Sequence, residues 1–156
     1  MAQGVLLFLS LGRMNESPFT PIPFRTTSDG PARVLVAEDD EEIRTVICAS
    51  LRDEGYDVTE AIDGDELVDW IAATVEGQAL PFDVIVSDIQ MPGFTALDVM
   101  AGLRRAVSRI PIILTTAYGD ANTRLTARRL GARRVLDKPF DLSALRAAVA
   151  EALPQR

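Results

Sequence analysis

The sequence predicts an α/β fold, a doubly wound five-stranded parallel sheet in the strand order 2-1-3-4-5. Three observations support this fold class. Short apolar segments alternate five times with amphipathic helical segments, which is typical of a parallel sheet covered by helices on both faces. The segment Val84–Val86 is apolar and β-branched throughout, as expected for a strand buried on both sides. Polar residues directly follow several strands, at the carboxyl ends where such sheets bind ligands.

The regular pattern begins at Arg33, where residues 33–37 form the first expected strand. A helix over residues 41–54 follows and ends at Gly55. Residues 57–61 then form the second strand. A second helix, over residues 65–75, completes this half. The residues at helical spacing in these two helices are Ile43, Ile47, Leu51, Leu67, Trp70, Ile71 and Thr74.

The second half of the chain repeats this alternation. Residues 83–87 form the third strand. Thr95 is placed to cap a helix that runs through Val107, because a threonine oxygen can accept an orphan amide at a helix start. Gly131 closes the fourth helix, since glycine tolerates the left-handed C-cap. The remaining elements are strand 110–115, helix 122–130, strand 134–136 and helix 142–153, the last with Leu142, Leu145, Val149 and Leu153 inward.

Residues 1–32 differ from the rest, so we divide the chain into an N-terminal extension (1–32) and one domain (33–156). Val5–Leu11 is apolar but shorter than the roughly 20 residues that span a bilayer. A secretory signal would have a basic region before its apolar segment, and none precedes Val5. The proline-rich residues 17–23 indicate an extended or weakly ordered tail. A start at Met14 and docking of Val5–Leu11 on a neighbouring chain are alternatives. Only three residues follow Leu153, so we expect no attached output domain.

Composition excludes several kinds of site. The single cysteine cannot form an internal disulfide, which fits a cytoplasmic location. The absence of histidine excludes serine–histidine triads, histidine metal sites and an internal histidine phosphodonor. The net charge is −7, and residues 33–70 hold thirteen acids and three bases, whereas residues 71–156 hold eight and eleven. This distribution suits a divalent cation and argues against nonspecific DNA binding.

The candidate reactive residues all follow strands at their carboxyl ends. Glu38 and Asp39 follow the first strand and Asp88 the third, and these two strands are neighbours in the expected order. Clustered carboxylates repel one another unless a cation or proton joins them, and oxygen ligands favour Mg²⁺. Asp88 could then act as a nucleophile toward phosphorus. Thr116 and Lys138 supply a hydroxyl and a positive charge for the phosphoryl oxygens.

Lys138 is the only lysine in the chain, against fifteen arginines. An ammonium is a compact point charge, so a site that needs one charge beside a phosphoryl oxygen distinguishes lysine from arginine. Pro139 restricts Lys138 and permits a cis peptide bond there. By contrast, Asp40 is better explained by the helix N-terminus that it precedes, and Cys48 by core packing.

Together these residues resemble the receiver domain of two-component response regulators, of the stand-alone single-domain type with a flavodoxin-like fold. The resemblance covers residues 33 to about 153. Its four motifs are Val34-Leu35-Val36-Ala37-Glu38-Asp39 for the first strand and acidic pair, Asp88 with Met91-Pro92-Gly93 for the phosphoacceptor and its turn, Thr116-Ala117 for the switch hydroxyl, and Lys138-Pro139-Phe140 for the lysine signature.

The resemblance implies a phosphoacceptor and not an enzyme in the ordinary sense. A histidine kinase or phosphotransfer protein would donate a phosphoryl group to Asp88. Its implied Mg²⁺ ligands are Glu38, Asp39, Asp88 and the backbone carbonyl of Gln90. Phosphorylation would change a contact with a downstream protein, with the basic region Arg124–Arg134 as a candidate surface and no direct contact with nucleic acid or membrane.

Several positions depart from the family pattern. Val135 stands where the family often has an aromatic switch residue, which leaves the coupled threonine and aromatic motion open. Thr95-Ala96 replaces a common aspartate-glycine turn, and Gln90 and Tyr118 occupy positions that tune the lifetime of the phosphoryl group.

Two rival functions remain. A Mg²⁺-dependent aspartyl-phosphate phosphatase would need a second aspartate where this chain has Gln90. A receiver-like module that is never phosphorylated would not need the acidic pair, Asp88, Thr116 and Lys138.

Overall fold

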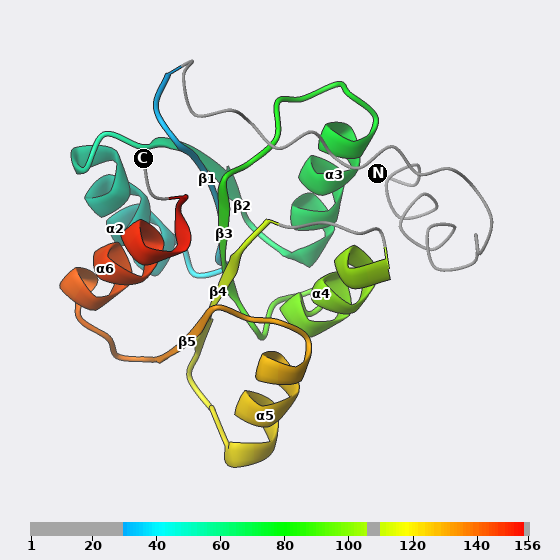
Figure 1. Cartoon of the computed structure of the whole chain (residues 1–156). Helices are drawn as coiled ribbons and strands as arrows, with labels where there is room; N and C mark the ends of the chain where they lie inside the picture. The colour runs from blue at the N-terminus through cyan, green and yellow to red at the C-terminus, as the bar shows by residue number, and fades with distance from the viewer. Residues whose placement is uncertain (1–29, 106–109, 155–156) are drawn as a thin grey trace.

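The computed structural model describes residues 30–105 and 110–154, in which strands and helices alternate along the chain (Figure 1). In chain order the elements are β1 Arg33–Ala37, α2 Glu41–Asp53, β2 Asp57–Ala61, α3 Gly64–Val75, β3 Val84–Asp88, α4 Ala96–Arg105, β4 Ile112–Thr116, α5 Ala121–Arg129, β5 Arg134–Asp137 and α6 Leu142–Ala152. All strand pairs are parallel, and the sheet order is β2-β1-β3-β4-β5. The predicted fold class is confirmed.

The sheet separates two helical layers. Helices α2 and α6 cover one face, and α3, α4 and α5 cover the other (Figure 1). Strand β1 serves both layers, because successive side chains of a strand point to opposite faces. Val34 and Val36 pack in the cluster that includes α2 and α6, whereas Leu35 and Ala37 pack in the cluster of the other face. This two-sided burial is why the central strands are apolar along most of their length.

The third and fourth strands each end one residue later than predicted. β3 ends at Asp88 and not at Ser87, because Asp88 pairs with Thr115 across the ladder. β4 ends at Thr116, which pairs with Asp137, and begins at Ile112 rather than at residue 110. Apolar periodicity does not detect a polar residue that continues a strand. The shift matters because it makes Asp88 part of a rigid strand rather than of the loop that follows it.

Side-chain caps start four of the described helices, whereas Asp141 at the start of α6 makes no such bond. Asp40, Asp63 and Asp120 each accept a hydrogen bond from the backbone N–H three residues later, as N-cap residues do. Thr95 and Asp98 bond reciprocally at the start of α4, which confirms the predicted threonine cap. Helices α3 and α5 begin one residue earlier than predicted because of these caps, at Gly64 and Ala121.

Some predictions lie outside the described residues. These are most of the extension at 1–32, including Val5–Leu11, and the predicted end near Val107 of the helix that Thr95 caps. Within residues 30–105 and 110–154, no helix combines the length and apolar character needed to cross a membrane.

Candidate functional site

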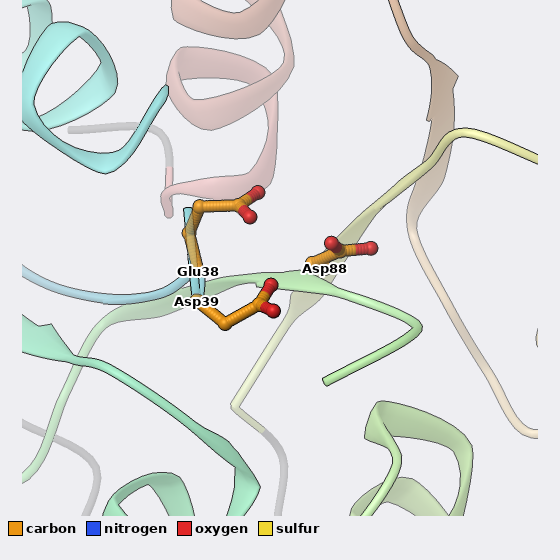
Figure 2. Close-up of side chains that lie close together, drawn as sticks. All are labelled: Glu38, Asp39 and Asp88. Atoms are coloured by element: carbon orange, nitrogen blue, oxygen red, sulfur yellow. The ribbon is translucent and has the colours of Figure 1, made fainter. Parts of the chain in front are cut away.

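Three carboxylates meet at the carboxyl end of the sheet. Glu38 and Asp39 follow β1, Asp88 ends β3, and these two strands are hydrogen-bonded neighbours. Ligand oxygens of the three residues lie within 4.8 Å of one another, and Figure 2 shows Glu38 and Asp39 pointing toward the side on which Asp88 lies. The topology thus brings together acids that are 50 positions apart in the sequence.

Lys138, which directly follows β5, contacts this cluster. Its Nζ donates to Oε2 of Glu38 at 2.8 Å and to Oδ2 of Asp88 at 3.0 Å. The peptide bond between Lys138 and Pro139 is cis. One ammonium therefore bridges carboxylates from two different strands and offsets part of their mutual repulsion.

Burial and the contacts within this cluster shift the pKa values of Glu38 and Lys138. Glu38 is only 1% exposed. Burial raises the pKa of Glu38, although the hydrogen bond from Lys138 opposes that rise. Burial alone would lower the pKa of Lys138, but its hydrogen bonds and charge interactions with Glu38 and Asp88 raise it instead. The ammonium therefore stays protonated between the two acids.

Asp88 is held in a fixed orientation. It is 7% exposed. Its Oδ1 accepts the backbone N–H of Gln90 at 3.2 Å while its Oδ2 accepts Lys138. Both carboxylate oxygens of Asp88 therefore accept a hydrogen bond, at the carboxyl end of the sheet. The side chain of Gln90 itself is exposed.

The two threonines of β4 occupy different environments. Thr115 lies beside Asp88 in the ladder, and its carbonyl accepts the N–H of Ile89. Thr116, the preferred candidate, is buried at the strand end, and its Oγ1 accepts the N–H of Tyr118 at 3.2 Å. Its carbonyl accepts the N–H of Lys138, so Thr116 and Lys138 are directly connected.

Asp39 and Asp40 are adjacent in the sequence but have different surroundings. Asp39 is exposed and belongs to the carboxylate cluster. Asp40 instead caps α2 by accepting the N–H of Ile43, and its own N–H donates to Oε1 of Glu38. Asp40 therefore orients Glu38, while Asp39 remains open to a cation.

The donor set suits Mg²⁺. A small hard divalent cation prefers oxygen ligands, keeps several waters and bridges to phosphate oxygens. Glu38, Asp39 and Asp88 supply only carboxylate oxygens, and Lys138 already contacts two of them. A cation bound here would complete the charge balance of three clustered acids.

Sequence reasoning missed the groups that hold the acidic turn. Arg44 of α2 donates from Nη1 to the carbonyl of Glu38 at 2.9 Å and from Nε to Glu60 at 3.1 Å. The N–H of Gly64 donates to the carbonyl of Pro92, which ties α3 to the loop after Asp88. No local pattern reveals such contacts between distant segments.

Comparisons with known proteins agree with this geometry. Residues 34–150 match the family model of the response regulator receiver domain. The transcriptional regulatory protein YkoG of Bacillus subtilis is 34% identical over 122 residues, which are 78% of this chain and 51% of that protein. The DNA-binding transcriptional regulator NtrC of Rhizobium meliloti is 36% identical over 124 residues, 80% of this chain and 24% of that protein. The chain thus spans about half or less of these relatives.

Solved structures are similar over a larger share of their own chains. The receiver domain of the Francisella response regulator 1452 has a TM-score of 0.70 and 29% identity, and the match covers 78% of this chain and 95% of that one. The chemotaxis protein CheY4 of Vibrio cholerae has a TM-score of 0.66 and 31% identity, with 80% and 100% covered.

Proposed function

The chain belongs to the family of response regulator receiver domains, and from this membership we propose that Asp88 accepts a phosphoryl group in two-component signalling. Receiver domains act as phosphoacceptors rather than as classical enzymes, and their partners are histidine kinases. These 156 residues contain no histidine, so the donor histidine lies outside them, in a kinase or a phosphotransfer protein.

The observation that carries this proposal is the environment of Asp88. Its carboxylate ends a buried strand, one oxygen contacts Lys138, and further acids lie within 4.8 Å. A carboxylate that is oriented and next to a positive charge is suited to attack phosphorus. The exposed position of Asp39 leaves its carboxylate accessible to a cation.

The transfer step follows from these groups. An Asp88 oxygen forms a bond to phosphorus as the bond between phosphorus and the donor nitrogen breaks, and the imidazole leaves with its electron pair. The proposed roles of Lys138 and the Thr116 hydroxyl are to contact the phosphoryl oxygens. The proposed Mg²⁺ ligands are Glu38, Asp39, Asp88 and the backbone carbonyl of Gln90, and bound Mg²⁺ supplies positive charge to the transferring oxygens.

The output is proposed to be a changed protein contact. A phosphoryl group that favours one loop arrangement shifts the population toward it. Four basic side chains on α5, β5 and the turn between them are exposed and offer one surface for such a contact: Arg128, Arg129, Arg133 and Arg134. Arg124, the first residue of the predicted region, instead contacts Asp137.

The two rival functions are less well supported. A phosphatase of this type needs an acid or base two residues after its nucleophile, and the amide of Gln90 supplies neither. A module that is never phosphorylated would not need the acidic pair, Asp88, Thr116 and Lys138 together at one end of the sheet.

A small phosphodonor tests the proposal without a cognate kinase. Purified protein would be incubated with acetyl phosphate and Mg²⁺ and followed by intact mass. We expect one phosphoryl adduct, which Asp88→Asn and removal of Mg²⁺ abolish. Asp53→Asn, an exposed carboxylate at the end of α2, is the matched control and should label like wild type. Equal labelling of Asp88→Asn and wild type would refute the proposal, and turnover of the donor without an adduct would favour the phosphatase.

A further inference from the structure

The loop between β4 and α5, residues 117–120, is held by a side chain outside the proposed site. Nε of Arg124 donates to the carbonyl of Gly119 at 3.2 Å, and its Nη2 donates to the carboxylate of Asp137. Asp137 lies directly beside Thr116 in the parallel ladder. The guanidinium therefore connects this loop to the neighbour of a proposed site residue.

We propose that Arg124 is a positioning residue for phosphoryl transfer to Asp88. It acts in two ways, by holding the loop that orients Thr116 and by neutralising Asp137. This inference rests on the proposed function. It adds Arg124, which contacts none of the reacting atoms, to the residues that affect the transfer.

The geometric part depends on how closely the loop packs. A Cβ on Gly119 would lie 2.7 Å from Oδ1 of Asp137 and 2.9 Å from Cγ2 of Thr116. The loop thus approaches both side chains more closely than any residue with a side chain allows. The N–H of Tyr118 also donates to Oγ1 of Thr116 at 3.2 Å. Any displacement of residues 118 and 119 would therefore move the environment of the Thr116 hydroxyl.

The electrostatic part depends on where Asp137 lies. It pairs with Thr116 and directly precedes Lys138. A phosphoryl group on Asp88 would bring further negative charge to this end of the sheet. An unpaired carboxylate at residue 137 would oppose that charge, whereas Arg124 offsets it.

The pair is unsuited to a mainly structural role. The side chains of Arg124 and Asp137 are 36% and 51% exposed, and exposed ion pairs contribute little to folding stability. Substitutions at Arg124 should therefore change the transfer rate more than they change thermal unfolding.

The test compares labelling rates among matched variants. Wild type, Arg124→Gln, Arg124→Lys and the double variant Arg124→Gln/Asp137→Asn would be treated with acetyl phosphate and Mg²⁺. Arg146→Gln is the control, since Arg146 of α6 pairs with Glu54 and the two side chains are 36% and 50% exposed, nearly the same as in the pair of Arg124 and Asp137. The rates of adduct formation and of adduct decay after donor removal are measured by intact mass, alongside thermal midpoints.

We expect Arg124→Gln to label roughly three- to tenfold more slowly than wild type, and its adduct to decay more slowly because the same groups assist water attack. Arg146→Gln should match wild type. The double variant should recover part of the loss, since it removes the uncompensated Asp137 charge, and Arg124→Lys should fall between. A purely structural role would reduce the labelled fraction without changing the decay rate of the folded adduct.

Three results would overturn the inference. One is equal labelling rates for Arg124→Gln and Arg146→Gln in a protein whose wild type labels. Another is a slower rate that matches an equal loss of folded protein, with unchanged adduct decay. A wild type that accepts no phosphoryl group would instead overturn the proposed function, and this inference with it.

Discussion

Lys138 is the residue on which the charge balance of the site depends. It bridges Glu38 and Asp88, and its side chain is only 16% exposed. We predict that Lys138→Met lowers the unfolding free energy of the metal-free protein by about 3 kcal/mol, because removing one partner of a buried pair leaves the other charges uncompensated. Urea denaturation at neutral pH would measure this change.

A surface pair provides the control for Lys138. Arg134 contacts Glu151 at 3.8 Å with both side chains more than half exposed, so Arg134→Met should cost no more than about 0.5 kcal/mol. If Lys138→Met were as stable as Arg134→Met, the lysine would not balance the acidic cluster.

The start of α3 controls the loop after Asp88. A Cβ on Gly64 would lie 1.8 Å from the carbonyl oxygen of Phe94, which is closer than any real contact. We predict that Gly64→Ala displaces residues 91–94 and destabilises the protein by about 2 kcal/mol or more, measured by urea denaturation. The phosphorylation rate should fall as well, because the displaced loop follows Asp88 directly.

Gly55 provides the control for Gly64, because it tests the cost of replacing a glycine where no atom lies near the added Cβ. Gly55 has a φ of +88° and no atom within 4 Å of an added Cβ, so Gly55→Ala should cost only about 1 kcal/mol of backbone strain and leave phosphorylation unchanged. Similar losses of activity in the two variants would show that the contact between Gly64 and Phe94 does not matter.

Glu60 links β2 to α2 and gives the domain a specific pH response. The hydrogen bond from Arg52, together with that from Arg44, lowers the pKa of Glu60 against the opposing effect of burial. A carboxyl whose folded pKa lies below its unfolded value stabilises the fold above the unfolded pKa and loses that effect as pH falls through the folded pKa. We predict that Glu60→Gln flattens the decline of stability below about pH 4.5.

Urea denaturation across a pH series would measure this slope. Glu76→Gln, at an exposed glutamate after α3, should retain the wild-type slope. An unchanged slope in Glu60→Gln would mean that the two arginines do not bind the ionised carboxylate selectively.

The elements themselves were largely predictable, and the misses have a common cause. The predicted bounds of β1 and β2 match the structure because apolar alternation and turn residues mark both ends. Asp88 and Thr116 were placed outside or at the edge of their strands because pairing with Thr115 and Asp137 decides their structure. Strand ends depend on the neighbouring strand, which a local pattern does not contain.

At the scale of the whole molecule, topology predicts more of the site than local sequence does. Glu38, Asp88 and Lys138 could be placed at one edge because parallel strands end together. The contacts of Arg44 with the Glu38 carbonyl and of Arg124 with Asp137 could not be foreseen. They depend on how two helices pack on the sheet.

Cation binding should stabilise the whole domain. We predict that Mg²⁺ at tenfold excess over its dissociation constant raises the unfolding free energy by about 1.4 kcal/mol, because it binds the folded state selectively. Asp39→Asn should reduce this increment, since Asp39 is the exposed member of the cluster. Thermal unfolding with and without Mg²⁺ measures this increase in stability.

Asp53→Asn is the control for this effect, because Asp53 lies at the far end of α2 from the site. It should keep the full increment. An equal Mg²⁺ increment in Asp39→Asn and wild type would place the cation elsewhere on the protein.

The most direct test of the central claim is to locate the phosphoryl group on the chain. Borohydride reduces an acyl phosphate to an alcohol, which marks the modified carboxylate permanently. Cleavage after arginine then separates Glu38 and Asp39, in residues 34–44, from Asp88, in residues 53–104, and fragment masses identify the reduced residue. We predict a single reduced carboxylate at Asp88, formed only when Mg²⁺ and the phosphodonor are both present. Reduction in residues 34–44, or at a different acid of residues 53–104, would contradict the assignment of Asp88 as the phosphoacceptor.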